Sequence, residues 1–362
     1  MRIMQVLPYL EKGGAERVVI ELCNSFSENG EDVTLLLISP VDSALNERNL
    51  SANVKVVFLY ESKRNRIRSF TKILPWIVGN RKYLREFDIV HCHLTFGLIF
   101  GTCFSAMRFF LRLRPPKLVL TCHMVGMDGF IKFLNMACSV FFDAFVLVGW
   151  NRDWRRFSHG KFGKNIHMIP NGITLSDSSR KEKKTTRKSN YAIGAISRLV
   201  AERKPELILQ TFSEIRKEGS EKFSFIFAGD GPELESLTKL ERELKLHDSV
   251  EMLGLVIEPG EVLQKLDAYV TISVASFPGI AALEAILHGV PVFGIQLMAD
   301  YSCKKSDIIW SSHDPAEVAK KIVNILSDSA QLVKYRQRQY TQATNDFNVT
   351  VMMKRYQEIY GV

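Results

Sequence analysis

Residues 276–292 of the chain read Ser276-Phe-Pro-Gly-Ile-Ala-Ala-Leu-Glu-Ala-Ile-Leu-His-Gly-Val-Pro-Val292, and their pattern is the clearest indication of the fold. Pro278 and Gly279 break the chain just before a run of Ala and Leu that favours a helix. Gly289 and Pro291 then end that helix in the order expected at a helix C-terminus. The apolar run that follows has the length and composition of a strand. The pattern therefore predicts a loop, then a helix, then a strand.

The start of this predicted helix suits an anionic ligand. A glycine-containing loop that leads into a helix offers unpaired backbone N–H groups and the positive end of the helix dipole, and both stabilise a phosphate. Glu284 lies about a turn and a half into the helix, in otherwise apolar sequence. A carboxylate in such surroundings is costly unless it is paired. Its candidate partners are sugar hydroxyls or a neighbouring Arg or Lys.

Bulk composition indicates a soluble protein of two domains. The chain has 362 residues, of which 46% are hydrophobic and 24% charged. No stretch reaches the roughly 20 uncharged apolar residues of a membrane span. The first residues lack a signal-peptide pattern, because Pro8 and Glu11 interrupt the apolar run. The six cysteines lack CxxC spacing, which favours reduced thiols. We therefore expect a cytoplasmic protein.

The net charge of +9 belongs entirely to the first half of the chain. Residues 1–175 hold 23 Lys and Arg against 14 Asp and Glu, whereas residues 176–362 hold 25 of each. Three segments of the first half mix cations with apolar and aromatic residues: 63–77, 107–114 and 130–134. Such segments suit an anionic membrane surface; the alternative is ordinary amphipathic helices with a solvated basic face. No nucleic-acid-binding motif is present, so we expect no nucleic acid partner.

Strand and helix patterns alternate along both halves. We expect strands at 2–7, 33–38, 54–59, 88–93, 117–123, 144–148 and 166–169, then at 191–196, 223–228, 250–253, 268–272 and 290–295. Helices are expected near 205–217, 233–246, 260–266 and 315–326. The alternation predicts an α/β protein with two consecutive doubly wound parallel sheets. The polar, charged stretch 176–190 is predicted to link a domain at 1–175 to one at 191–344.

Several of these segments together resemble the family 4 glycosyltransferases, which are retaining, nucleotide-sugar-dependent enzymes. The matching segments are Gly13–Glu16, Asp88–His93, His123, Ile169–Ile173, Ser197–Arg203, Ala228–Pro232 and the stretch quoted above. Each motif alone is weak, but together they follow the family's order and spacing over nearly the whole chain. The resemblance implies the GT-B fold: two Rossmann-like domains facing a cleft, with a C-terminal helix at about 345–362 crossing back to the first domain.

The resemblance places most of the donor site in the second domain. Arg198 and Arg203 stand where the family has cations that stabilise the leaving diphosphate, with Lys204 beside them. Glu284 matches a carboxylate that binds the donor ribose. The other predicted donor-binding residues are Gly229, Asp230, Gly231, Leu255, Val256, Ser276, Phe277, Pro278, Gly279, Ile280 and Ala281. The structural alternatives are solvated surface cations, an ion pair of Glu284 and plain turns.

In the first domain, the resemblance places Gly13 and Gly14 where the backbone approaches the donor phosphate or the acceptor. The turn is not GxGxxG, so a dinucleotide fingerprint is absent. His123 matches a residue that contacts the donor sugar. Glu16 and Asn171 are expected on the acceptor side, although Glu16 also fits an ordinary first-turn helix charge.

His91 and His93 alternate along one predicted strand and therefore share one face. They match a core strand of the family, so we do not expect them to bind a metal. The chain has no DxD pair that would hold a metal-bound diphosphate. We therefore expect no metal and no cofactor apart from the nucleotide sugar, which is a co-substrate.

One departure from the family concerns the donor sugar. The family has a second Glu eight residues before Glu284, where this chain has Ser276. The loop Gly294–Lys304 also lacks the family's Gly-Gly pattern. These differences predict either a different donor sugar or a weakened site.

The function expected from the sequence is glycosyl transfer. The enzyme would move a hexose or N-acetylhexosamine from a nucleotide diphosphate sugar, with UDP favoured, to a saccharide or lipid-linked glycan. Bacterial surface polysaccharide or glycolipid assembly at the cytoplasmic face of the inner membrane is the expected setting. One alternative is a non-catalytic family member that binds nucleotide or a partner transferase. A third hypothesis is a nucleotide-sugar epimerase of the same fold.

Overall fold

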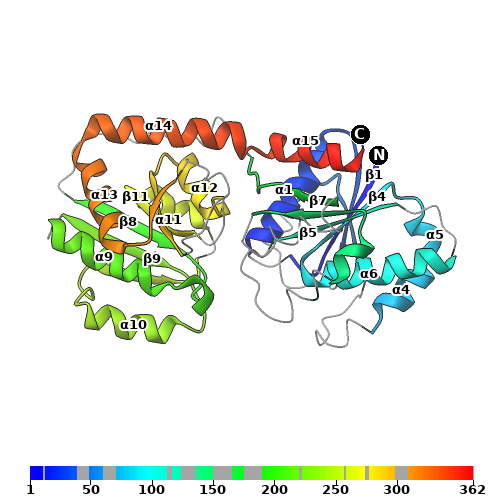
Figure 1. Cartoon of the computed structure of the whole chain (residues 1–362), viewed down its shortest axis with the longest axis horizontal. Helices are drawn as coiled ribbons and strands as arrows, with labels where there is room; N and C mark the ends of the chain where they lie inside the picture. Colours follow the sequence, from blue (N-terminus) through cyan, green and yellow to red (C-terminus); the bar gives the residue numbers. More distant parts are fainter. Residues whose placement is uncertain are drawn as a thin grey trace. The chain divides into compact units, whose positions relative to one another are not determined.

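The computed structural model of the chain contains two compact units, each a sheet flanked by helices (Figure 1). It describes residues 1–10, 13–38, 49–59, 71–111, 116–123, 134, 137–149, 165–174, 190–219, 222–256, 258–273, 277–297 and 309–361. Unit 1 consists of Met1–Thr174 and Val349–Val362, and unit 2 of Leu175–Asn348. The predicted linker 176–190 lies outside the described residues except for Asn190.

Unit 1 contains a parallel sheet with the strand order β3-β2-β1-β4-β5-β6-β7. Its strands are β1 Arg2–Leu7, β2 Asp32–Leu37, β3 Lys55–Phe58, β4 Ile89–His93, β5 Lys117–Cys122, β6 Ala144–Leu147 and β7 Ile166–Met168. The strand order reverses between β1 and β4, and ligands of such sheets bind at the carboxyl ends of the strands at this point. The expected fifth strand was one residue too long, since β5 ends at Cys122 and His123 follows the sheet.

Helices cover both faces of this sheet. They are α1 Gly14–Glu28, α4 Ile73–Gly79, α5 Arg81–Leu84, α6 Leu94–Leu111 and α15 Val349–Tyr360, with a 3-10 turn η1 at Ser139–Phe141. Phe100 and Phe104 of α6 pack in one core cluster with Val90 and Cys92 of β4. On the opposite face α15 packs against α1, where the rings of Phe26 and Tyr360 stack at 5.5 Å. The expected C-terminal helix therefore completes the first unit.

Unit 2 contains a second parallel sheet, with the order β10-β9-β8-β11-β12-β13. Its strands are β8 Tyr191–Ile196, β9 Phe223–Ala228, β10 Val250–Gly254, β11 Ala268–Ser273, β12 Val292–Gln296 and β13 Trp310–Ser312. The order reverses between β8 and β11, as it does between β1 and β4 in unit 1. The edge strand β13 was not predicted, because three residues ending in two serines give no apolar pattern.

The helices of unit 2 flank this sheet. They are α9 Glu206–Gly219, α10 Leu234–Glu243, α11 Pro259–Lys265, α12 Ile280–Leu287, α13 Pro315–Ser327 and α14 Ser329–Asp346, with a 3-10 turn η4 at Ala201–Arg203. The opening stretch folds as expected. Gly289 has φ 69°, a conformation that favours glycine, and the next N–H reaches back from Val290 to the carbonyl of Ala285 at 2.9 Å. The chain reverses direction at Gly289, and β12 then pairs with β11 in the sheet.

Within the described part of the chain, no helix is long and apolar enough to cross a membrane. The five cysteines that the structure describes form no disulfide: Cys23, Cys92, Cys103, Cys122 and Cys138.

The core of unit 2 gives the first prediction. Phe212 of α9 is fully buried and its ring stacks on Phe225 of β9 at 4.6 Å. Phe212→Ala should lower the free energy of unfolding of this unit by about 3–5 kcal/mol, because it leaves a cavity as well as losing apolar contact. The matched control is Glu218→Ala, an exposed change on the same helix, with an expected effect below about 0.5 kcal/mol. Urea denaturation of both variants measures the difference, and similar midpoints would contradict the packing.

Candidate active site

The loops after β8 and β9 form one interlocked backbone structure in unit 2. Leu199 N–H donates to the carbonyl of Asp230 at 3.0 Å, and Glu233 N–H donates to the carbonyl of Leu199 at 3.0 Å. A Cβ on Gly229 would lie 1.9 Å from the carbonyl oxygen of Ser197, and one on Gly231 would lie 2.3 Å from that of Leu199. These glycines are therefore required by the close approach of two backbones.

Three cations follow β8 on this interlocked loop. Arg198 and Lys204 are exposed, and Arg203 is half-buried at the end of η4. Burial and then the charge of Arg198 lower the pKa of the Arg203 guanidinium, which stays protonated at neutral pH. Two like charges that interact in this way favour a bound anion, because an anion relieves their repulsion. The structure thus brings the two predicted diphosphate-binding arginines together.

Tyr269 joins this group from the neighbouring strand β11. Its hydroxyl donates to the carbonyl of Ile196 at the end of β8, at 3.0 Å. Burial raises the pKa of Tyr269, the nearby Glu284 carboxylate raises it further, and Arg203 opposes the rise. Glu284 itself is 8% exposed on α12. Arg203, Tyr269 and Glu284 therefore interact where the strand order reverses.

No sequence motif singled out Tyr269. The available signal was a tyrosine within the short strand Ala-Tyr-Val-Thr-Ile-Ser, whose phenol needs a hydrogen-bond partner when buried. An apolar strand pattern accommodates Tyr without distinguishing it from the purely apolar residues around it.

At the start of α12 the N-cap residue is a glycine, which has no side chain to cap the helix. Gly279 is the extended N-cap residue, and its carbonyl accepts from Ala282 and Leu283, both at 3.1 Å. Gly279 is exposed, and Pro278, Ile280 and Ala281 are half-buried. The ring of Phe277 packs edge-on against Phe347 at 5.9 Å, which gives this site residue a packing role. Ser276 lies outside the described residues.

The end of β10 adds an exposed apolar surface. Gly254 turns the chain with φ 65° and accepts from Gly229 N–H at 2.7 Å. Leu255, the next residue, is 63% exposed and Val256 is half-buried. The structure thus places these two predicted donor-binding residues beside the Gly229 loop.

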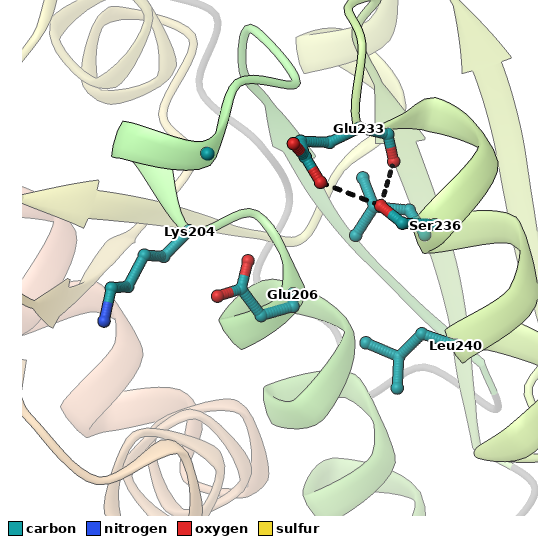
Figure 2. Close-up of a pocket in the computed structure, with 7 residues that line it drawn as sticks. Lys204, Glu206, Glu233, Ser236 and Leu240 are labelled. Carbon is teal, nitrogen blue, oxygen red and sulfur yellow. Dashed lines mark hydrogen bonds between the residues drawn. The ribbon is translucent and has the colours of Figure 1, made fainter.

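A cavity of about 320 Å³ lies beside the cation loop, between η4 and the first turns of α9 and α10 (Figure 2). Its lining residues are Ala201, Lys204, Glu206, Glu233, Ser236, Leu237 and Leu240. The Ser236 hydroxyl is shared between the carbonyl and the carboxylate of Glu233, at 2.8 and 2.9 Å. Figure 2 shows the Lys204 amine pointing away from this pair. Lys204 is the only predicted site residue among those that line this cavity. The cavity therefore lies next to Arg198 and Arg203, and neither arginine lines it.

In unit 1 Gly13 is the extended N-cap residue of α1. A Cβ on Gly13 would lie 2.1 Å from the Glu16 carboxylate, so the two residues are in close contact. This position fits the reading of Glu16 as a first-turn helix charge. Asn171 is half-buried in the segment that leaves unit 1, next to Gly172, whose N–H contacts the Met352 sulfur at 3.1 Å.

His123 lies directly after β5; the residue is half-buried, and its Nδ1 is buried. Its Nε2 lies 3.0 Å from Nδ1 of His93. Burial lowers the pKa of His123 to about 4, so the ring is neutral at neutral pH. Among the described residues no group of three or more His, Cys, Asp or Glu is arranged to hold a metal ion.

The sequences of both units match models of known protein families. The sequence profile described as "Glycosyltransferase Family 4" matches residues 12–177, and that described as "Glycosyl transferases group 1" matches residues 190–328. The chain belongs to the family 4 glycosyltransferases. The family resemblance inferred from the motifs is thereby confirmed, and both halves of this glycosyltransferase chain contribute to it.

Relatives of known sequence and structure agree with this assignment. O-antigen biosynthesis glycosyltransferase WclY of Escherichia coli is 28% identical over 229 residues, which are 59% of this chain and 62% of WclY. Anabaena HepE, solved with UDP and glucose, has a TM-score of 0.74 at 16% identity and covers 100% of this chain and 99% of its own. A Staphylococcus aureus TarM variant, solved with fondaparinux, α-GlcNAc-glycerol and UDP, also has a TM-score of 0.74, at 10% identity and 100% coverage of both chains. The chain therefore has the GT-B fold.

The second prediction concerns the interlocked loop of this glycosyltransferase chain. Gly231→Ala should destabilise unit 2 by more than about 1 kcal/mol, because its φ of 151° and the Leu199 carbonyl both exclude a side chain. Gly260→Ala is the matched control. It lies in α11 with its nearest neighbour 3.5 Å away, so the change should be neutral or stabilising. Thermal melting compares the two, and an unchanged melting temperature of Gly231→Ala would contradict the geometry.

Proposed function

We propose that this chain is a retaining glycosyltransferase that transfers a hexose or N-acetylhexosamine from a UDP-sugar to a saccharide or lipid-linked glycan. The observation that carries the proposal is the group formed by Arg198, Arg203 and Glu284 where the strand order of unit 2 reverses. It combines adjacent positive charges with a nearly buried carboxylate. A nucleotide diphosphate needs the first for its phosphates and the second for its ribose hydroxyls.

In this proposal the reaction is a displacement on one face of the anomeric carbon. The bond between the anomeric carbon and the diphosphate oxygen breaks, and the acceptor oxygen bonds to the anomeric carbon on the same face. The acceptor proton passes to the departing phosphate oxygen. Arg198 and Arg203 stabilise the negative charge that develops on the diphosphate as it leaves. In this proposal guanidinium groups supply that charge, and the transfer proceeds without a metal ion.

The choice of donor and setting is supported by the relatives. HepE and TarM were solved with UDP, and HepE also with glucose. WclY is named for O-antigen biosynthesis. We extend these properties to the present chain as proposals: a UDP-sugar donor, and a role in assembling a bacterial surface polysaccharide or glycolipid at the cytoplasmic face of the inner membrane.

Nucleotide release tests the proposal directly. The protein is incubated with UDP-, GDP- and ADP-sugars in turn, with saccharide and lipid-linked acceptors, and the free nucleotide is measured. Acceptor-dependent release of UDP is expected. Binding of UDP by calorimetry without release from any donor would overturn the transferase proposal and favour the non-catalytic alternative that Ser276 suggests.

Arg198→Ala gives the third prediction. Turnover should fall by about 10²–10³-fold, because one of the two cations at the leaving group is lost. Lys239→Ala removes a cation from α10, where the side chain is 81% exposed, and is the matched control with unchanged turnover expected. Steady-state nucleotide release measures both variants. Equal rates in the wild type and Arg198→Ala would rule out the assigned role.

Peripheral membrane contact belongs to the same proposal. Leu74 and Val78, one turn apart on α4, are 46% and 40% exposed, and the adjoining α5 carries the exposed cations Arg81 and Lys82. Apolar side chains flanked by cations suit an anionic bilayer. Of the predicted basic segments, 71–77 is described with α4 and 63–70 is not; 107–114 and 130–134 also lie largely outside the described side chains.

Vesicle binding is the fourth prediction. The wild type should co-sediment with vesicles containing phosphatidylglycerol, and the bound fraction should fall as salt rises. The double change Leu74→Ser with Val78→Ser should reduce binding several-fold, since it removes the apolar contact. Val333→Ser removes an exposed apolar side chain from α14, 51% exposed, and should leave binding unchanged. Equal loss in both variants, or none in either, would contradict this surface.

A further inference from the structure

A buried polar network runs across the carboxyl-end half of the first sheet. Gln5 of β1, His91 and His93 of β4 and Thr121 of β5 are all 0% exposed. Gln5 is paired with His91 and Thr121 with His93 in the strand register, so all four side chains share one face. Five neighbouring polar groups, with His123, are unusual in a parallel sheet, whose strands are normally apolar on both faces.

The network reaches His123 through two short contacts. Nε2 of His93 lies 2.7 Å from Oε1 of Gln5, and Nδ1 of His93 lies 3.0 Å from Nε2 of His123. In this orientation the amide oxygen of Gln5 faces His93, and because an amide oxygen only accepts, His93 then carries its proton on Nε2. In a neutral ring Nδ1 of His93 is then an acceptor, and it takes a hydrogen bond from Nε2–H of His123. The remaining nitrogen of His123, Nδ1, is left as an unprotonated acceptor.

The rings are held in the neutral state that this reasoning requires. Burial lowers the pKa of His91 and His93 well below the ordinary value, and the neighbouring imidazoles lower them further. A second proton on any of the three rings would place a charge among uncharged groups. The acceptor oxygen of Gln5 therefore determines which nitrogen of His93 carries the proton, and His93 in turn determines which nitrogen of His123 carries it.

The position of His93 is fixed from three sides. Leu94, the next residue, has φ 60° and begins α6 without an intervening loop. A leucine in this conformation is strained, and such strain is characteristic of functional sites. A Cβ on Gly97 would lie 3.0 Å from the Cys92 backbone, so the helix packs directly on the strand. On the other side the ring of His91 lies 4.1 Å from that of His93.

Helix α15 holds His91 in turn. Tyr360 contacts His91 Nδ1 at 2.7 Å, and Tyr356 contacts the Thr121 hydroxyl at 2.9 Å. Thr121 lies 2.7 Å from the second nitrogen of His91. Both ring nitrogens of His91 and both ring nitrogens of His93 therefore have a hydrogen-bond partner. At the end of the network, Nδ1 of His123 is buried with no hydrogen-bond partner among the described residues.

We propose that Gln5 and His93 are positioning residues that hold the His123 ring in one tautomer, with Nδ1 as an acceptor for a hydroxyl proton of the sugar ligand. The inference rests on the proposed function for the identity of that ligand, whereas the tautomer follows from this chain's own contacts. A buried acceptor without a partner is costly, and a ligand hydroxyl removes the cost. A neutral acceptor suits a sugar hydroxyl better than an imidazolium, which has no lone pair to offer.

Imidazole NMR on the intact chain tests the tautomer without any need for activity. The eight histidines are labelled with ¹⁵N, and His123 is assigned from the His123→Gln variant. In the wild type, the His123 signals should show a single neutral form protonated at Nε2. Gln5→Leu removes the acceptor that fixes the pattern, so both tautomers of His123 should be populated. Gln5→Glu keeps an acceptor oxygen in place and should restore the single form.

Gln339→Leu is the matched control. Gln339 is a second buried glutamine, 1% exposed, which accepts from Val292 N–H at 2.9 Å in unit 2. The same substitution there should lower stability and leave the His123 signals unchanged. A single His123 tautomer in Gln5→Leu, or the Nδ1-protonated form in the wild type, would overturn the proposal.

Kinetics separate this inference from the proposed function. Gln5→Leu should lower kcat/KM for transfer by about tenfold or more, while the Kd for UDP stays within about twofold, because most of the predicted nucleotide-binding residues lie in unit 2. Mixed tautomers together with unchanged transfer would show that His123 positioning does not serve the reaction. Mixed tautomers with a wild type that transfers no sugar would refute the function alone.

Discussion

The described strands are all paired in parallel, and this constraint determines where chemistry can occur in the molecule. Parallel strands require crossover helices, so the carboxyl ends of all strands in a sheet collect at one edge. Where the order reverses, at β1 and β4 or at β8 and β11, successive crossovers leave in opposite directions. The predicted site residues follow strands at these edges because the backbone there is released from the ladder.

The same edge has opposite electrostatic character in the two units. In unit 2, exposed or half-buried guanidinium groups lie near a carboxylate, an arrangement that favours an anionic ligand. Unit 1 gathers neutral imidazoles, a buried amide and hydroxyls, an arrangement suited to uncharged hydroxyl groups.

Sequence periodicity was sufficient for most strands, because buried parallel strands are continuous apolar runs. It failed for β13, where Trp310-Ser-Ser is too short to show a period. The motifs identified the arginine pair and Glu284 as candidates, but their interaction with Tyr269 depends on the pairing of β8 and β11, which no local pattern encodes. Gln5 was the hardest residue to predict. It is one polar residue within the strand Arg-Ile-Met-Gln-Val-Leu, and only the fold brings His93 into contact with it.

The placement of α15 has a consequence for how the chain acquires its structure on the ribosome. Unit 1 uses residues from both sides of unit 2 in the sequence, so it stays incomplete while roughly 170 further residues are synthesised, on the order of 10–35 s at typical rates. During that interval His91 and Thr121 lack the hydroxyls of Tyr360 and Tyr356. Until α15 is made, the nascent first sheet therefore keeps buried polar groups that lack two of their hydrogen-bond partners.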